Sequence, residues 1–90
     1  MPSYLIETYL ARGQAAERTS RERQARSAAE ELTREHTRVR FDRSIHIPED
    51  EICFYIFDAP SARVAALAAQ RAGLDPLRVV EAVSSGDEEE

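Results

Sequence analysis

The chain has 90 residues, a formal net charge of −5 and a single cysteine, Cys53. This length fits one domain, the lone cysteine excludes an internal disulfide and a cysteine-rich metal site, and the negative charge argues against nucleic acid as the main partner. No apolar run reaches the ~20 residues of a membrane helix, and the first residues lack a basic signal region, so we expect a cytoplasmic protein without membrane attachment.

The first third of the chain predicts a strand and then a helix. Residues Tyr4–Leu10 are rich in aromatic and branched side chains, and Arg12-Gly-Gln14 ends this strand. Thr19-Ser-Arg-Glu22 matches a capping box, which marks a helix start. The helix carries a narrow apolar stripe of Ala25, Ala28, Ala29, Leu32 and His36. Its other positions interleave arginine with glutamate, the pattern of a solvated face.

The middle of the chain predicts a hairpin. Residues Val39–Ile47 alternate with period two, Pro48–Glu51 form a polar turn, and Ile52–Phe57 are apolar at nearly every position. A strand that is apolar on both faces must be covered on both faces. In a chain this short, we expect one cover to be a helix layer and the other a second copy of the protein.

The last third predicts a helix and a final strand. Pro60 and Ser61 begin the helix, and Gly73 follows its end. Its predicted inner stripe is Val64, Leu67, Ala68, Arg71 and Ala72. Residues Arg78–Val83 form the fourth strand, and we expect residues 85–90 to be a disordered acidic tail.

The predicted order, β-α-β-β-α-β, favours a ferredoxin-like α+β domain over residues 1–84. In that fold a four-stranded antiparallel sheet carries two helices on one face. The other face is bare, so we expect a homodimer in which two sheets form a barrel or sandwich.

The hairpin register decides which residues share a face. A four-residue loop pairs Ile47 with Ile52, and continuing this register gives His46–Cys53, Ile45–Phe54, Ser44–Tyr55 and Asp42–Phe57. The face expected under the helices holds Phe41, Arg43, Ile45, Ile47, Ile52, Phe54 and Ile56, with Tyr4, Ile6 and Thr8 of the first strand. The face expected to be open holds Asp42, Ser44, His46, Cys53, Tyr55 and Phe57, with Leu5, Glu7 and Tyr9.

Several stretches resemble a family of small ferredoxin-like proteins that is named for a nickel-binding member and was long catalogued as a domain of unknown function. These stretches are Tyr4-Leu-Ile-Glu7, Phe41…Ser44…Cys53-Phe-Tyr55, Asp58-Ala-Pro-Ser61 and Ala72-Gly-Leu…Arg78-Val-Val-Glu81. The resemblance implies a dimer and, in at least one member, a metal held by histidines and carboxylates. Many relatives carry a histidine on the second helix where this chain has Ala68.

Two side chains could start a metal site on the expected open face. His46 and Cys53 suit a divalent ion such as nickel or zinc, and Glu7 or Asp42 could complete its ligands. Two subunits could share such a site across a twofold axis. In the alternative reading, Cys53 is a small buried apolar residue and His46 is solvated. A small ligand would instead contact Tyr9, Ser44 and Tyr55.

Three functions follow from these features. The favoured one is a small dimeric, non-enzymatic binding or accessory protein, with a metal or small ligand between the two sheets. The first alternative is a cofactor-free or haem-type enzyme of the dimeric α+β-barrel class, with Glu7, His46 and Tyr55 lining its pocket. The second alternative is an interaction module that uses the arginine-rich helix against an acidic partner.

Overall fold

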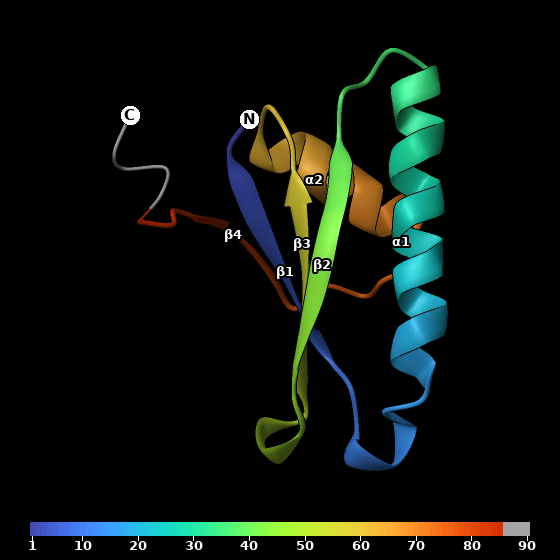
Figure 1. The fold of residues 1–90 in the computed structure, drawn as a ribbon, viewed down its shortest axis with the longest axis vertical. Coiled ribbons are helices and arrows are strands. Elements are labelled where there is room, and N and C mark those ends of the chain that lie inside the picture. The colour runs from blue at the N-terminus through green and yellow to red at the C-terminus, as the bar shows by residue number, and fades with distance from the viewer. Residues whose placement is uncertain (86–90) are drawn as a thin grey trace.

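The computed structural model describes residues 1–85, and the fold is the predicted ferredoxin-like α+β arrangement (Figure 1). The strands are β1 (Ser3–Tyr9), β2 (Arg40–Ile47), β3 (Ile52–Asp58) and β4 (Arg78–Ala82). The helices are α1 (Glu17–Arg34) and α2 (Ala62–Arg71). The expected acidic tail lies outside the described residues, apart from Ser85.

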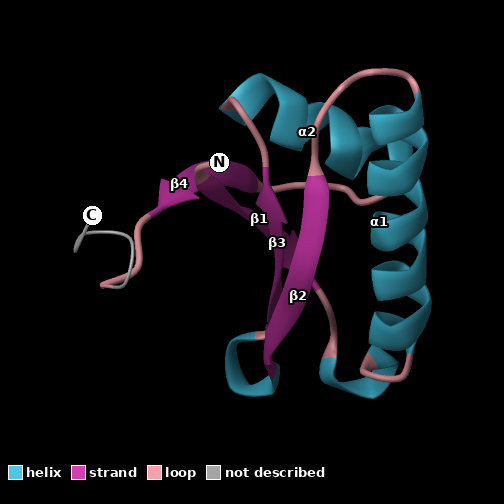
Figure 2. Cartoon of the chain, turned by 45° about the horizontal axis from the view of Figure 1, so that its top comes forward, coloured by secondary structure: helices cyan, strands magenta, loops and turns pink. Residues whose placement is uncertain are grey.

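The four strands form one antiparallel sheet in the order β2-β3-β1-β4. Both helices lie on the same side of this sheet, which leaves the other side without a covering layer (Figure 2). Strands β2 and β4 are the two edges. We call the two sides the helix face and the open face.

Helix α1 begins earlier than the capping box predicts. Its first residue is Glu17, and no side chain caps it. The short 3-10 turn at Arg12–Gln14 leads directly into the helix, and the Arg18 N–H already donates to the Ala15 carbonyl at 3.1 Å. Backbone bonds of this turn therefore replace the side-chain cap that the sequence pattern suggested.

Both helices end in the same way, at a residue with left-handed backbone geometry. Gly73 follows α2 with a φ of 79°, as predicted, because glycine adopts this conformation without strain. His36 follows α1 with a φ of 72°, and its N–H donates to the Thr33 carbonyl. His36 is exposed, so the expectation that it extends the apolar stripe of α1 is wrong.

The core joins small residues on the helices to large residues on the sheet. The buried helix residues are almost all alanines: Ala25, Ala28, Ala29, Ala65, Ala68 and Ala69. The sheet supplies Phe41, Tyr55 and Phe57, and the first and last of these rings pack edge to face with centroids 5.4 Å apart. Small helix side chains let the helices approach closely, and large rings then fill the remaining space.

The inner stripe of α2 is rotated relative to its prediction. Ala68 and Ala72 are buried as expected, but Leu67 is 39% exposed and Arg71 lies on the surface. Arg71 instead forms ion pairs with Glu31 and Glu35, at the C-terminal end of α1. The alanines at 65 and 69 occupy the positions that face the sheet.

The predicted hairpin register is confirmed over most of its length. His46 pairs with Cys53 and Ser44 with Tyr55, and Ile47 lies opposite Ile52. The last predicted pair is wrong, because Phe41, and not Asp42, lies opposite Phe57. A β-bulge between Phe41 and Arg43 inserts one residue and turns the Phe41 ring toward the helices.

The two faces of the hairpin are the reverse of the prediction. Cys53, Tyr55 and Phe57 are 0% exposed and lie under the helices. Pairing with β1 requires this, since Ile6 lies directly opposite Tyr55 and Tyr4 opposite Phe57. The prediction put the β1 residues on the correct face but assigned the hairpin residues without reference to β1. The helices bury small alanine side chains, so the large side chains of Tyr55 and Phe57 fill the space beneath them.

Candidate functional site

The sheet separates the residues that were expected to form one site. Ser44, His46, Cys53 and Tyr55 lie on the helix face, whereas Glu7 and Tyr9 lie on the open face. Asp42 sits at the bulge and lines a hollow of the open face. The proposed metal ligands His46 and Glu7 are therefore on opposite sides of the sheet. The pocket expected for an enzyme, with Glu7, His46 and Tyr55 side by side, is not formed.

The helix-face residues form a small interior polar cluster. Ser44 donates a hydrogen bond to Glu22 of α1, and the Thr8 hydroxyl donates to the Cys53 carbonyl at 2.8 Å. His46 Nε2 and Tyr55 Oη are buried without a hydrogen-bond partner in the described part of the chain.

Burial changes the acidity of two groups in this cluster, the Cys53 thiol and the Tyr55 phenol. It raises the pKa of the Cys53 thiol and the pKa of the Tyr55 phenol, because both lose the water that would stabilise their anions. A buried, protonated thiol is neither a strong nucleophile nor a ready metal ligand.

The residues present do not fit the metal that the family resemblance implies. Within residues 1–85, no three histidine, cysteine, aspartate or glutamate side chains are arranged to hold an ion. His46 and Cys53 are neighbours, but the nearest predicted carboxylates lie across the sheet. Because the pair faces α1, a second subunit on the open face could not add ligands to it.

The open face carries an apolar surface that is interrupted by Glu7. Its apolar members, from all four strands, are Leu5, Tyr9, Ile45, Ile47, Ile52, Phe54, Val80 and the largely buried Ile56. Tyr9 is 55% exposed, Ile45 43% and Ile47 36%. Apolar surface of this kind marks an interaction site more often than isolated exposed residues do.

The charges of the open face are paired within the chain. Glu7 and Arg78 lie opposite each other on β1 and β4, with Oε1 and Nε 3.3 Å apart. Arg43 contacts Asp42 at 2.7 Å. An apolar face whose charges already have partners loses less on being covered than one with free charges.

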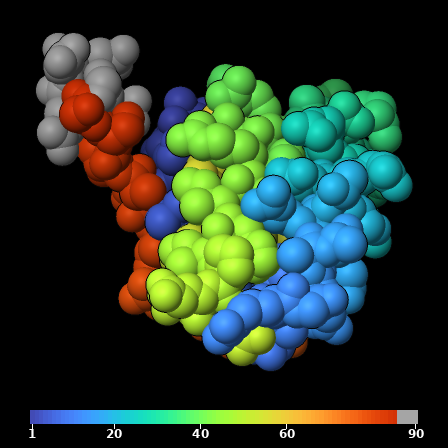
Figure 3. All heavy atoms as spheres, turned by 60° about the horizontal axis from the view of Figure 1, so that its bottom comes forward, coloured from blue at the N-terminus to red at the C-terminus, as the bar shows by residue number. Residues whose placement is uncertain are grey.

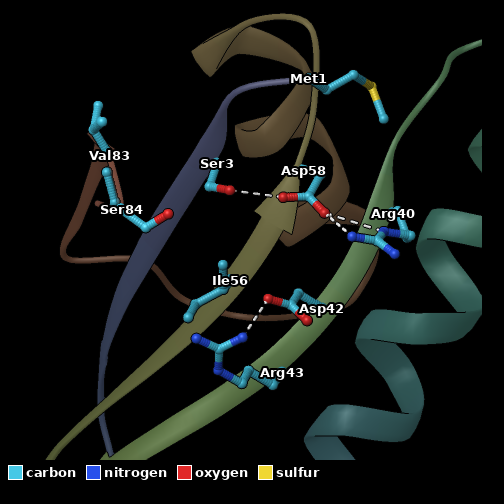
Figure 4. Close-up of a pocket in the computed structure, with 10 residues that line it drawn as sticks. Met1, Ser3, Arg40, Asp42, Arg43, Ile56, Asp58, Val83 and Ser84 are labelled. Atoms are coloured by element: carbon cyan, nitrogen blue, oxygen red, sulfur yellow. Dashed lines mark hydrogen bonds and ion pairs between the residues drawn. The ribbon is translucent and has the colours of Figure 1, made fainter. Parts of the chain in front are cut away.

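A hollow of about 470 Å³ opens at one end of this face (Figure 4). The Ser3 hydroxyl donates to one oxygen of Asp58 at 2.7 Å, and Arg40 binds the other oxygen. Ile56 forms part of the apolar lining, and the Arg43–Asp42 pair lies at the side. The hollow thus presents positive, negative and apolar groups together.

Asp58 accepts hydrogen bonds from both Ser3 and Arg40 in the hollow. Partial burial alone would raise the pKa of its carboxyl, but the hydrogen bonds from Arg40 and Ser3 outweigh that effect and hold the pKa below its usual range. Asp58 therefore stays ionised. In the sequence, Asp58 belongs to the Asp58–Ser61 junction, and its proximity to Arg40 follows only from the pairing of β2 with β3.

Fold and site together define a ferredoxin-like α+β domain with an apolar open sheet face and a charged hollow at its edge. Among solved structures, the chain resembles the crystal structure of SCO4226 from Streptomyces coelicolor A3(2), with a TM-score of 0.69 and 19% sequence identity. The match covers 92% of this chain and 98% of that one, and at this identity it establishes the fold alone. No family model matches the chain, and neither does any curated protein. In residues 1–85, no helix is long and apolar enough to span a bilayer.

Proposed function

We propose that this protein is a homodimeric, non-enzymatic binding protein, in which the open faces of two chains pack against each other. The observation that carries the proposal is the apolar surface of the open face, where Tyr9, Ile45 and Ile47 are more than a third exposed. Covering such side chains contributes roughly 25 cal/mol per Å² of apolar area, so a second sheet is a strong source of stability.

A second copy is the occupant that best fits this surface. The face spans four strands and carries ion pairs that are already satisfied within one chain, such as Glu7–Arg78. Two identical faces related by a twofold axis match in size and in apolar character without further adaptation. The family resemblance, which implies a dimer, agrees with this choice.

The hollow beside Asp58 is the proposed ligand site. It opens on the same side of the sheet as the interface, so a second copy would restrict its access to solvent. Arg40 pairs with Asp58 and Arg43 with Asp42 next to the apolar Ile56, so a charged ligand would bind by sharing or exchanging these ion pairs. These groups suit a small zwitterionic molecule, whose carboxylate and ammonium would each find a partner. We propose no metal at this site.

The dimer is tested by sedimentation equilibrium at micromolar concentration with a matched pair of variants. Ile45→Glu places a charge on the open face, and Leu67→Glu places the same charge on α2 at a similarly exposed apolar residue. We expect twice the mass of one chain for the wild type and for Leu67→Glu, and the mass of one chain for Ile45→Glu. A wild type that sediments as a single chain would refute the proposal.

The ligand site is tested separately by calorimetry with L-glutamate as a zwitterionic probe. We expect saturable binding by the wild type and at least tenfold weaker binding by Arg43→Gln. The surface variant Arg12→Gln is the control, because Arg12 lies in the 3-10 turn that follows the C-terminal end of β1, whereas Ser3 at the other end of β1 lines the hollow. Equal heats for the two variants would remove the hollow from the proposal and leave the dimer standing.

A further inference from the structure

A second surface lies on the other side of the molecule, between α1 and the edge strand β2. Figure 3 shows the surfaces of these two elements side by side. A groove of about 790 Å³ runs between them. Its floor is apolar and nearly fully buried, and consists of Ala29, Val39 and Phe41. Three arginines, Arg26, Arg34 and Arg40, also line it.

The groove is positively charged in a chain that is negative overall. Among residues 1–85, Glu30 is the one acidic residue in its lining, against three arginines. Arg40 is paired with Asp58. Within residues 1–85, neither Arg26 nor Arg34 has a carboxylate within ion-pair distance, and Glu30 has no cation. Two guanidinium groups thus remain available to an anionic partner.

Arg26 is held in place before any partner binds. Its guanidinium carbon lies 5.2 Å from the centroid of the Phe41 ring. A stacked guanidinium keeps its N–H groups available for hydrogen bonds while its rotamer freedom is already reduced. A carboxylate that binds Arg26 therefore meets a smaller entropic cost than one that must order a free arginine.

The edge position of β2 favours an extended partner. An edge strand presents unpaired backbone N–H and C=O groups to its free side, and a peptide in extended conformation can run beside them. Along such a peptide, side chains point alternately to two sides. One set could reach the apolar floor near Val39, and the other could reach Arg26 and Arg34.

From this arrangement we infer that the α1–β2 groove binds an extended acidic segment of a partner protein. Carboxylates of the segment pair with Arg26 and Arg34, and its apolar side chains lie beside Val39, since Arg26 already covers the Phe41 ring. The apolar floor and Glu30 disfavour a nucleic acid backbone. The groove shares Arg40 with the hollow of the open face but shares no residue with the apolar surface proposed for the dimer, so the two proposals are tested separately.

The test measures fluorescence anisotropy of a short fluorescein-labelled peptide in which glutamate alternates with valine. A peptide with glutamine in place of glutamate is the matched probe. We expect the wild-type chain to bind the glutamate peptide and to lose affinity as salt rises, because the screening length falls from about 10 Å at 0.1 M to about 3 Å at 1 M. Equal binding of both peptides would overturn the inference.

Charge variants locate the binding surface. The double variant Arg26→Glu, Arg34→Glu should weaken binding at least tenfold, and the control Arg12→Glu, Arg63→Glu should leave it unchanged. The milder pair Arg26→Gln, Arg34→Gln, checked by circular dichroism, guards against loss of the fold. Equal affinities for the groove and control variants would overturn the inference.

One other occupant is distinguished by the same assay. The chain's own acidic residues, Asp87, Glu88, Glu89 and Glu90, could compete for the arginines. Replacing them by their amides in the full chain should change the affinity by less than about threefold if the groove serves a partner. If the peptide binds the amide variant but not the wild type, the groove belongs to the chain's own tail and the inference is wrong.

Discussion

The helix face and the open face of the sheet both carry large apolar side chains, yet one is sealed and the other is not. Phe57 on the helix face is 0% exposed, while Ile45 on the open face is 43% exposed. The difference lies in the opposing layer, because the alanine-rich helices leave room that only aromatic side chains fill. On the open face nothing within the described chain performs that role. Alternation along the strands thus defines two sets of side chains, and the layer that packs on the sheet determines which set is buried.

The largest expected effect comes from replacing a phenylalanine by alanine on each face of the sheet. Phe57→Ala should lower the free energy of unfolding by about 3–5 kcal/mol, because it opens a cavity in a close-packed core. Phe54→Ala, three residues earlier on the same strand β3 but on the open face, should lower it by about 1 kcal/mol in the isolated chain. Urea unfolding followed by far-ultraviolet circular dichroism measures both.

Protein concentration supplies the control for this pair. If the chain dimerises, the stability lost in Phe54→Ala relative to the wild type should grow as protein concentration rises. The stability lost in Phe57→Ala relative to the wild type should persist at every concentration. If the two variants lose equal stability at the lowest concentration, the two faces do not differ in the way the structure indicates.

A smaller effect tests the polar cluster under α1. Tyr55→Phe removes a buried hydroxyl that has no partner in residues 1–85 and should raise the free energy of unfolding by about 1 kcal/mol. The hydroxyl-free ring keeps its contacts with Phe41. A loss of stability in Tyr55→Phe would mean that the hydroxyl has a partner, such as a buried water.

The same cluster predicts a loss of stability in alkali. Burial raises the pKa values of Cys53 and Tyr55 above their ordinary values of 9.0 and 10.0, so the unfolded chain releases these protons first. The contribution is fully present below about pH 9 and declines as pH rises further. Urea titrations from pH 7 to 11 should show this decline, and it should be weaker in Tyr55→Phe. An identical pH profile for the two proteins would contradict the assignment.

The smallest effect belongs to the paired charges of the open face. Glu7→Gln removes one partner of an ion pair with Arg78, whose side chain is 66% exposed. Exposed pairs contribute about 0–1 kcal/mol, so the thermal unfolding midpoint of the isolated chain should fall by no more than about 4–8 °C. A large loss would show that Glu7 is a structural residue of the monomer and not a surface charge of the interface.

Much of the fold was predictable from the sequence, because it depends on local signals. The order of elements, the hairpin loop, the Ser61 start of α2 and the Gly73 end each follow from turn and cap chemistry. The facing of the hairpin could not be predicted in the same way. A bulge at Phe41 and the choice of face depend on how α1 and α2 pack, which no local pattern encodes.

The candidate site was less predictable for a related reason. His46, Cys53 and Glu7 were grouped because their residue types suit a metal, but the hairpin faces the other way, so His46 and Cys53 lie under the helices while Glu7 stays on the open face. The charged hollow was missed, because Arg40 and Asp58 are 18 residues apart and meet only through the β2–β3 register. The register of the strands determines which charged residues become neighbours, and residue type alone does not.

Arg40 lines both the hollow on the open face and the groove beside α1. One guanidinium therefore serves two binding surfaces, and its present partner is Asp58. A carboxylate in the groove that draws Arg40 away takes a donor from the hollow, and a ligand in the hollow that retains it does the reverse. By thermodynamic reciprocity, each occupant must change the affinity of the other by the same factor. The first residue of an edge strand thus couples the two faces of a very small domain.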